Sequence, residues 1–450
     1  MLYPAAAGLG LLAGYSVLMS PSLVKLLLLL PGLVFAVTVS PEKLFVGWLF
    51  CAPFVDGAAA GDHSGHAFYK FLFLVPPVIL FARMSTGELR RSRLWVIDLL
   101  PALYVAYIVV RVELLPSAFT GTAASPRGIY TGVGIAAISY YFAAFARTTD
   151  RFPVRVASSL LWSGIIVSVL ALVDAATGWN LWNTVEAGEG TATRRVVSTF
   201  ASPGALGAYI GAGVVFSVAI LAWNGPHSLR RPAILLIPLS IPALFFTYSR
   251  GPALGAVTVA VAMALVANRA RLPSLLVVAT VAILVFAVWG QITSSSIYRG
   301  RLGVTETVTT REEIQRVTLK LIRERPVFGW GYNTFDKAKL TVPSRNPIFD
   351  QLSSHSTFLT VLAELGVVGL TLLLLPWFVI GLRAVSAAQR GLADKWIVAA
   401  CVGVPLAYAL GALTYDTRFF SLITALPWIT LGIARNLLAR QQTRIESVQP

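Results

Sequence analysis

Two arginines and a helix-opening turn stand close together near the middle of this 450-residue chain. Arg194 and Arg195 precede a Ser-Pro-Gly turn at 202–204 that is expected to begin a helix. Backbone N–H groups at a helix N-terminus, together with guanidinium charge, suit an anion such as phosphate. If the chain lies in a membrane, an isolated arginine pair can equally contact lipid headgroups, and this alternative stays open.

A third arginine occupies a very short turn. Arg250 lies in Ser-Arg-Gly-Pro, in a turn of two or three residues between two apolar runs. So short a turn holds the side chain near the hydrocarbon boundary, where an unpaired arginine is costly. Pro252 suits the first turn of the following helix. We expect a functional role for Arg250 rather than a purely structural one.

One histidine is placed where it could take up a proton. His355 follows Ser353 and Ser354, which are candidate caps of the next helix. A neutral imidazole, with an unperturbed pKa of about 6.5, can accept a proton from a hydroxyl. The alternative is a structural hydrogen bond, which is the commoner role of a lone histidine. Glu364 lies about 13.5 Å further along the helix and is expected to pair with another buried group.

A glycine-rich turn and a pair of histidines complete the polar candidates. Gly329 and Gly331 in RPVFGWGYNTF (325–335) allow a tight turn whose aromatic residues could stack on sugar rings. Such turns are also common at membrane interfaces. His63 and His66 lack a convincing third ligand, so no metal site is expected.

The elements that must position these residues are membrane helices. Hydrophobic residues make up 56% of the chain, which is enough for about 12 spans of about 20 residues each. Charged residues make up only 12%. This composition excludes a soluble enzyme, a disordered tail and a nucleic-acid module. The net charge of +16 is therefore expected to set membrane topology rather than to bind nucleic acid.

The expected fold is an all-α polytopic integral membrane protein with about 12, and up to 14, transmembrane helices. A long extracytoplasmic loop with short helices interrupts the bundle. The apolar runs lie near 5–20, 23–39, 43–55, 68–82, 94–110, 127–146, 154–174, 203–223, 232–248, 251–267, 272–290, 356–381, 395–413 and 418–434.

Basic residues divide the connecting segments into two sets. Six arginine-rich clusters, each separated from the next by two apolar runs, are predicted to be cytoplasmic by the positive-inside rule. They lie at 83–93, 147–155, 230–231, 269–271, 383–395 and 435–444. The external segments are then 56–67, 111–126, 175–202, 247–251, 291–354 and 414–417, so all the polar candidates above fall on the external face.

This topology gives four parts. Residues 1–290 form the first part of the helix bundle, 291–354 an extracytoplasmic (periplasmic) subdomain, 355–436 the last part of the bundle, and 437–450 a cytoplasmic tail. Within 311–325, Ile314, Val317 and Leu321 share one helical stripe. We expect this amphipathic helix to end at Pro326 and to lie on the membrane surface.

Taken together, the four polar stretches resemble the O-antigen ligase and polymerase superfamily of multi-span glycosyltransferases. The matching pieces are the stretch from Arg195 through Phe200 to Pro203, Ser-Arg-Gly at 249–251, Pro-x-x-Gly-x-Gly at 326–331, and His-x-x-x-Leu at 355–359 followed by Ala-Glu-Leu-Gly at 363–366. Their order and spacing match, as does the long external loop before the histidine.

The resemblance implies an inverting, metal-independent glycosyl transfer at the periplasmic face of the bacterial cytoplasmic (inner) membrane. It implies a glycan donor on undecaprenyl pyrophosphate, a glycan, lipid or protein acceptor, contact with membrane lipids, no cofactor and no nucleic acid. Arg195 and Arg250 would hold the pyrophosphate with help from Arg194, and His355 would be the base. Ser356 replaces the asparagine that is frequent in the family. Supporting roles fall to Glu364, Gly329 and Gly331.

Two other functions remain open at this stage. A polymerase of the same superfamily would differ only in its acceptor, which the sequence does not reveal. A lipid-linked oligosaccharide flippase or other transporter would place charges near the bilayer midplane and often has repeated halves. Here the candidate residues gather at one face and no internal repeat is evident.

Overall fold

The structure of the chain, a computed structural model, describes residues 38–59, 95–114, 129–146, 148–182, 195–267, 305–343, 354–418 and 420–446. This described part is helical and contains no strand. Arg194 lies outside it, as do Ser353, His63, His66 and the apolar runs predicted at 5–20, 68–82 and 272–290.

Six helices of the described part are long and apolar enough to cross a membrane. They are α8 (Phe152–Thr177), α9 (Pro203–Ala222), α10 (His227–Thr247), α16 (Thr357–Gln389), α17 (Lys395–Ala412) and α18 (Ser421–Glu446), the last over Ser421–Gln442. Two apolar helices are shorter: α7 (Ile135–Phe145), which continues the π-helical turn η6 (Tyr130–Gly134), and α11 (Arg250–Val266). The chain is therefore a multi-pass membrane protein, but the expected count of 12 to 14 spans is not confirmed.

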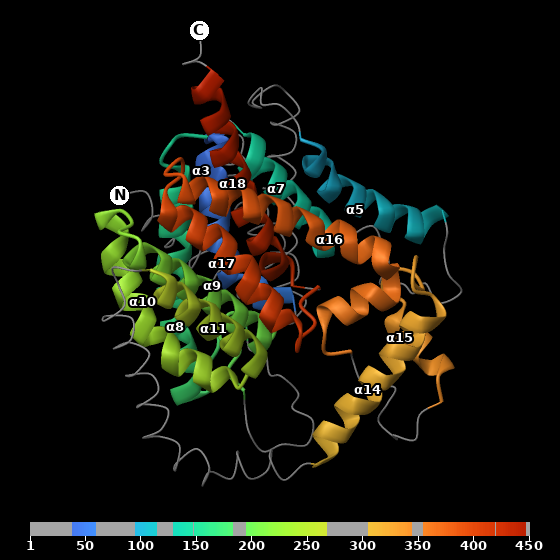
Figure 1. Cartoon of the computed structure of the whole chain (residues 1–450). Helices are drawn as coiled ribbons and strands as arrows, with labels where there is room; N and C mark the ends of the chain where they lie inside the picture. Colours follow the sequence, from blue (N-terminus) through green and yellow to red (C-terminus); the bar gives the residue numbers. More distant parts are fainter. Residues whose placement is uncertain are drawn as a thin grey trace.

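Several shorter elements complete the described part of the chain. The predicted run at 43–55 folds as α3 (Pro41–Cys51) and the 3-10 turn η1 (Ala52–Phe54), followed by η2 (Asp56–Ala59). The run at 94–110 folds as η3 (Val96–Leu99) and α5 (Leu100–Val109), and α5 continues into the π-helical turn η4 (Val110–Leu114). Helix α5 packs against α16, as Figure 1 shows.

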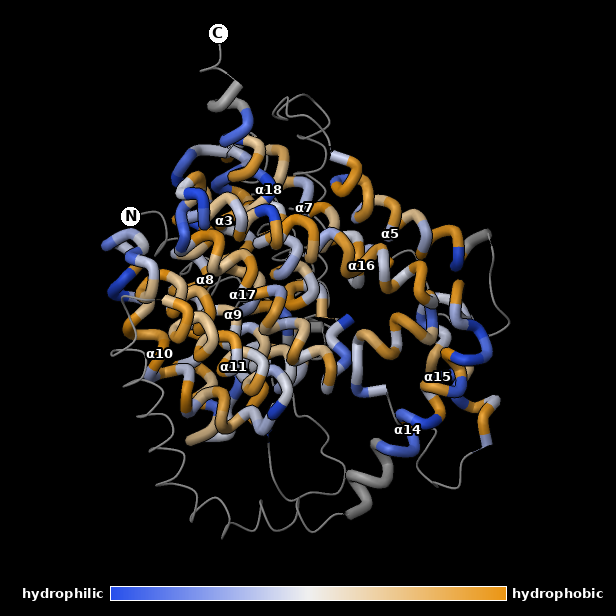
Figure 2. The backbone as a smooth tube through the Cα atoms, in the orientation of Figure 1, coloured by the Kyte–Doolittle hydropathy of each residue, from blue (hydrophilic) through white to orange (hydrophobic). Residues whose placement is uncertain are grey.

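Helix α9 lies at the centre of the bundle and packs against α8, α10, α11 and α17. Its glycines let neighbouring helices come close, because a Cβ added at Gly211 would lie 2.8 Å from the Cβ of Ala256 in α11. A Cβ at Gly213 would lie 2.8 Å from Leu236 in α10. Small residues allow this kind of close helix packing in membranes. Figure 2 shows the predominantly apolar bundle that results.

A small subdomain is built from α14 (Thr305–Glu324), α15 (Phe335–Ala338) and the 3-10 turn η7 (Lys339–Thr341). The amphipathic helix forms as expected, but its apolar stripe faces the core of the subdomain and not a membrane surface. Ile314, Val317 and Leu321 are almost fully buried, and they pack with Trp330, Phe335, Ala338, Val342 and Ala363. The apolar stripe is the core of the subdomain, because burial against these side chains removes it from water.

Segments that were predicted to be cytoplasmic meet at one end of the bundle. Arg435 in α18 is fully buried and contacts Asp98 of η3 at 2.9 Å, with its guanidinium 3.9 Å from the centre of the Trp95 ring. Arg440 forms an ion pair with Asp150 at the same end. The segments predicted to be external meet one another at the opposite end, where the candidate site residues lie.

Candidate active site around loop 414–418

The segment that begins with Arg195 lies beside the turn that carries Arg250. Nε of Arg195 donates a hydrogen bond to the carbonyl oxygen of Thr247 at 3.3 Å, and the N–H of Val196 donates to the carbonyl of Phe246 at 3.2 Å. These bonds join residues about 50 positions apart. The two arginine-bearing segments are therefore neighbours in space, as expected from the resemblance.

Two buried carboxylates support the Arg195 segment, and both were missed in the sequence. Asp174 near the end of α8 accepts hydrogen bonds from the N–H groups of Val197 (3.2 Å) and Ser198 (2.9 Å). Asp56 accepts a long one from the N–H of Ala201 at 3.5 Å. Burial raises the pKa of Asp56 to about 7, and the Ala201 hydrogen bond opposes that shift. The sequence did contain a signal for Asp174, because a carboxylate at the end of an apolar run is expected to have a specific partner.

Arg250 is the first residue of α11 and its side chain is exposed. Only Tyr248 and Ser249 separate α10 from α11, which confirms the short turn, and Tyr248 turns the chain with a φ of 50°. No carboxylate of the described residues forms an ion pair with Arg250. An exposed cation in the first turn of a helix favours an anionic ligand, because the helix dipole adds to its charge.

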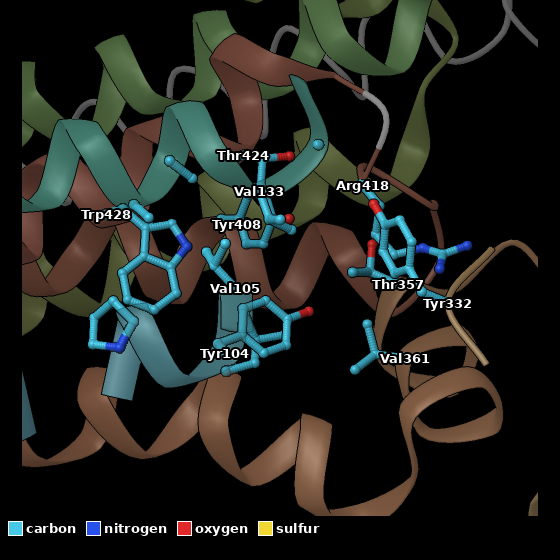
Figure 3. A pocket seen from close by; sticks show the side chains of 15 residues that line it. Tyr104, Val105, Val133, Tyr332, Thr357, Val361, Tyr408, Arg418, Thr424 and Trp428 are labelled. Atoms are coloured by element: carbon cyan, nitrogen blue, oxygen red, sulfur yellow. The ribbon is translucent and has the colours of Figure 1, made fainter. Parts of the chain in front are cut away.

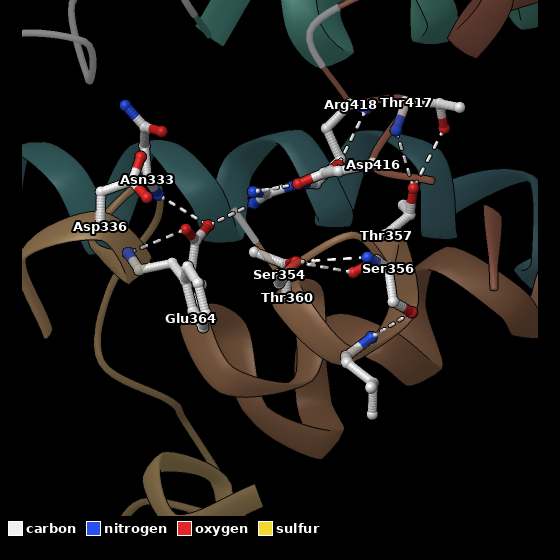
Figure 4. A network of polar contacts seen from close by, with 12 residues as sticks. Asn333, Asp336, Ser354, Ser356, Thr357, Thr360, Glu364, Asp416, Thr417 and Arg418 are labelled. Atoms are coloured by element: carbon white, nitrogen blue, oxygen red, sulfur yellow. Dashed lines mark hydrogen bonds and ion pairs between the residues drawn. The ribbon is translucent and has the colours of Figure 1, made fainter. Parts of the chain in front are cut away.

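His355 is held on a tightly constrained turn before α16. Its φ of 53° is one that side-chain-bearing residues rarely adopt, and such strain persists only when the surroundings enforce it. The hydroxyl of buried Ser354 donates to the carbonyl of Ser356 and contacts the hydroxyl of Thr360 (Figure 4). His355 itself is half-buried between two buried serines.

The cap of α16 differs from the expectation. Ser356, rather than Ser353 or Ser354, is the N-cap, because its Oγ accepts a hydrogen bond from the N–H of Leu359 at 3.4 Å. The helix therefore begins at Thr357, and His355 precedes the cap by one residue. Ser356 fixes the backbone next to His355, which is a structural contribution to the site.

The glycine-rich turn packs backbone to backbone against a break in α16. The break is at Gly366, where φ is 66° and ψ is −169°. The N–H of Gly331 donates to the carbonyl of Glu364 at 2.7 Å, and that of Trp330 to the carbonyl of Ala363 at 3.0 Å. A Cβ at Gly329 would lie 2.3 Å from the carbonyl oxygen of Glu364. Gly329 and Gly331 thus support the site through close packing.

Two aromatic residues of this turn, Trp330 and Tyr332, are buried and do not offer a ring face to a sugar, contrary to the expectation. Trp330 is 8% exposed, donates from its indole N–H to the carbonyl of Leu321 at 2.9 Å and lies under Arg325. Tyr332 is 3% exposed. Both rings are used inside the protein, because the turn closes the core of the subdomain.

A loop between α17 and α18, residues 414–418, joins these pieces, and it was not singled out in the sequence. The hydroxyl of Thr357 donates to the carbonyl of Tyr415 at 3.1 Å. It also accepts from the N–H of Thr417 at 3.0 Å, as Figure 4 shows. The hydroxyl of Tyr415 also contacts that of Ser202, the N-cap of α9. One loop residue therefore connects the start of the His355 helix with the end of the Arg195 segment.

The same loop also packs closely on two glycines. A Cβ added at Gly204 would lie 2.3 Å from the ring of Tyr415, and one at Gly251 would lie 1.8 Å from the hydroxyl of Thr414. Gly251 follows Arg250 directly. Any side chain at 204 or 251 would push the loop away, so these glycines allow the arginine segments to approach it.

Arg418 links the loop to the segment of α16 that carries Glu364. Its guanidinium contacts Glu364 at 2.5 Å and Asp416 at 2.8 Å. Glu364 is 1% exposed and also accepts hydrogen bonds from the N–H groups of Asn333 (2.8 Å) and Phe335 (3.1 Å). The expected pairing of Glu364 with a buried group is confirmed. Asp416 and Arg418 sit in a short turn between two apolar runs, which is the same signal that drew attention to Arg250.

A small cavity lies beside this loop. Figure 3 shows its aromatic walls, with Tyr104, Tyr332 and Trp428 around it and Arg418 at one end. The remaining lining is largely aliphatic and comes from α5, η6, α7, α16 and α18. A second small cavity, bordered by small residues of α9, α11 and α17, shares Tyr408 with the first. Both cavities offer mainly apolar surface directly beside the loop.

Metal ligands do not cluster in the part of the chain that the structure describes: no three His, Cys, Asp or Glu side chains there are arranged to hold an ion. The cations described in this site are the guanidinium groups of Arg195, Arg250 and Arg418.

Comparison with known proteins supports the resemblance. Residues 233–374 match the family model described as O-antigen ligase, and the match includes Arg250, Gly329, Gly331, His355 and Glu364. Arg195 and loop 414–418 lie outside the matched range. No curated protein matches the chain. The resemblance to the O-antigen ligase and polymerase superfamily is thus confirmed over this range, and it indicates a membrane glycosyltransferase-like enzyme.

Proposed function

We propose that the protein transfers a glycan from undecaprenyl pyrophosphate to an acceptor hydroxyl at the periplasmic face of the bacterial cytoplasmic membrane. His355 is the general base of this reaction. Arg195 and Arg250, with Arg194, bind the pyrophosphate of the donor. The transfer needs no metal ion, because the guanidinium groups supply the positive charge that a leaving pyrophosphate requires.

One observation carries the proposal: the segments that hold Arg195, Arg250 and His355 all contact loop 414–418. The contacts are those of Tyr415 with Ser202, Thr414 with Gly251, and Thr357 with Tyr415 and Thr417. Nothing in a membrane bundle requires these distant segments to share one loop. A single site that binds an anion and contains a base would explain why these three segments meet at one loop.

The reaction follows from these roles. His355 accepts the proton of the acceptor hydroxyl while the hydroxyl oxygen forms a bond to the anomeric carbon of the donor. The bond from that carbon to the pyrophosphate oxygen breaks, and the lipid pyrophosphate leaves with the electron pair. Attack opposite the leaving group inverts the anomeric configuration. General-base assistance of this kind contributes about 10²–10⁴ in rate.

The cavities support a lipid-linked donor rather than a free sugar nucleotide. Their aromatic and aliphatic walls lie beside the loop and inside the bundle, which is an apolar environment that suits a lipid-linked substrate. Arg195 and Arg250 stand at the same end of the bundle. A substrate with an anionic head and an apolar tail fits this combination of charge and apolar surface.

The test is transfer by purified protein in detergent, with an undecaprenyl-pyrophosphate-linked glycan and candidate acceptors. We expect His355→Ala and Arg250→Ala each to abolish transfer without lowering the amount of folded protein. Matched controls are His227→Ala and Arg231→Ala, which remove an exposed histidine and an exposed arginine from the first turns of α10, at its opposite end from Thr247. Both controls should transfer at the wild-type rate.

Different outcomes separate the roles. Wild-type transfer by His355→Ala would remove the base assignment, and wild-type donor binding by Arg250→Ala would remove that arginine from the pyrophosphate site. A single glycan linkage to a lipid or protein supports a ligase, whereas a growing ladder of repeat units supports a polymerase. Turnover in detergent, where no second compartment exists, contradicts a flippase.

A further inference from the structure

The turn that leads from α14 to the glycine-rich stretch displays two large apolar side chains. Val327 is 50% exposed and Phe328 is 58% exposed. Their neighbours in sequence, Gly329 and Trp330, are buried. On a surface that faces water, an exposed phenylalanine next to an exposed valine is unfavourable, because contact with water raises the free energy of both side chains.

The exposure is built in, because the backbone of this turn is held from both sides. The N–H of Val367 donates to the carbonyl of Pro326 at 2.9 Å, and that of Val368 to the carbonyl of Val327 at 3.3 Å. From α5, the hydroxyl of Tyr107 donates to the carbonyl of Phe328 at 3.2 Å. These bonds to α16 and α5 fix the direction in which the two side chains point.

The bonds to α16 also define the position of the turn relative to the hydrocarbon core of the membrane. Val367 is the first residue after the break at Gly366, and the helix from there to Leu382, just before the predicted cytoplasmic cluster at 383–395, is about 24 Å long, most of the roughly 30 Å of a bilayer's hydrocarbon core. Along this stretch Val367, Phe378 and Leu382 are 54%, 63% and 70% exposed and form a lipid-facing surface. The turn lies beside the first residue of the spanning stretch and therefore at one edge of the hydrocarbon core.

The positive charge near the turn is consistent with a position at the edge of the hydrocarbon core. Arg323 and Arg325 lie within three residues before Pro326, on either side of Glu324, and both are exposed. Guanidinium groups beside exposed apolar side chains are the combination that binds the headgroup region of an anionic bilayer. On the other side of the turn, Val109 and Val110 are 39% and 37% exposed, which extends the apolar surface onto α5 and η4.

We propose that the turn 323–328 is an interfacial anchor. Val327 and Phe328 insert at the edge of the hydrocarbon core, while Arg323 and Arg325 bind anionic lipid headgroups. Because the next residues of the turn bond to Ala363 and Glu364, the anchor sets the depth of the 305–343 subdomain relative to the candidate site. This inference does not depend on the reaction proposed above.

The test measures the depth of a nitroxide in proteoliposomes. Phe328→Cys is labelled in a Cys51→Ala, Cys401→Ala background, and Val327→Cys serves as a second site in case the first does not fold. The control label is at Glu312, which is exposed and lies about 18 Å along α14 from its end at Glu324. Collision with oxygen, which concentrates in lipid, is compared with collision with a water-soluble nickel chelate.

We expect labels at 327 and 328 to collide mainly with oxygen and the label at 312 mainly with the nickel chelate. In phosphatidylglycerol vesicles, Arg323→Gln with Arg325→Gln should move the 328 label toward water, and in phosphatidylcholine vesicles the shift should be much smaller. A 328 label as accessible to nickel as the 312 label overturns the anchor and leaves the patch as a docking site for another protein. Equal burial of both labels also overturns it, because α14 as a whole would then lie in the interface.

Discussion

The guanidinium of Arg418 lies 2.5 Å from the carboxylate of Glu364, which is 54 residues away in sequence. Both side chains are buried, and Glu364 binds two N–H groups of the 333–335 turn at the same time. A single ion pair therefore joins loop 414–418, helix α16 and the glycine-rich turn. The position of His355, nine residues before Glu364 on the same polypeptide segment, depends on that junction.

Removing Arg418 should destabilise the protein strongly. Arg418→Met leaves the carboxylates of Glu364 and Asp416 close together without their cation, and breaking a buried ion pair in this way costs roughly 3–5 kcal/mol. Glu364→Gln should cost less, because Arg418 keeps its contact with Asp416. Thermal unfolding in detergent measures both effects. Arg316→Met, which removes an exposed ion pair with Glu313, is the control and should leave the unfolding temperature unchanged.

Gly329→Ala should be far more damaging than Gly391→Ala. Both glycines have positive φ, 64° and 72°, so each alanine carries the roughly 1–2 kcal/mol cost of a left-handed backbone. Only at 329 does the new Cβ also meet another chain segment, 2.3 Å from the carbonyl of Glu364, whereas nothing lies within 4 Å at 391. Unfolding temperatures of the two variants compare the effects. Equal losses would mean that the backbone contact at Gly329 is unimportant.

Thr357→Val should reduce transfer while the protein stays folded. Valine keeps the shape of threonine but leaves the N–H of Thr417 without its acceptor, at a cost of about 1–3 kcal/mol. Since displacement of catalytic groups by about 1 Å can cost about a hundredfold in rate, we expect a loss between about tenfold and about a hundredfold. Thr341→Val removes a comparable hydrogen bond, to Ala338, far from the loop, and should transfer normally. A normal rate for Thr357→Val would show that loop 414–418 does not position His355.

Stability should fall with rising pH through Asp56. Burial raises the pKa of this carboxyl from its ordinary value of 3.8 to about 7, so the folded state favours the protonated form. The resulting stability is complete below the unfolded pKa and is lost as the pH rises through the folded one. The unfolding temperature of the wild type should drop between about pH 4 and about pH 7 more than that of Asp56→Asn, which resembles the protonated acid. Parallel curves for the two proteins would contradict this role.

Chelators should not affect the proposed transfer. Arginine side chains can stabilise a leaving pyrophosphate electrostatically without a divalent ion. Initial rates measured with EDTA and with added Mg²⁺ or Mn²⁺ should agree. Activity that is lost in EDTA and restored by one of these ions would replace the arginine-based mechanism with a metal-assisted one.

Local features of the site were predictable because they depend on neighbouring residues. The short turn at Arg250, the helix start after the Ser-Pro-Gly sequence at 202–204 and the tight turn at Gly329 and Gly331 all follow from local backbone preferences. The cap at Ser356 rather than Ser354 was missed, because three serines compete there and only the folded backbone selects among them. The amphipathic pattern of 311–325 was also correct, but the pattern does not say which apolar surface covers it.

By itself, the sequence determined that this is a helical multi-pass membrane protein with its anion-binding and proton-accepting candidates in a few short turns. Long apolar runs leave no other choice, because backbone polar groups in lipid must be bonded within each helix. Only the tertiary structure decided that loop 414–418 holds these turns together, with Tyr415 and Ser202 in contact across 213 residues. Such contacts have no sequence period, since they depend on how whole helices pack and on the glycines that let them approach.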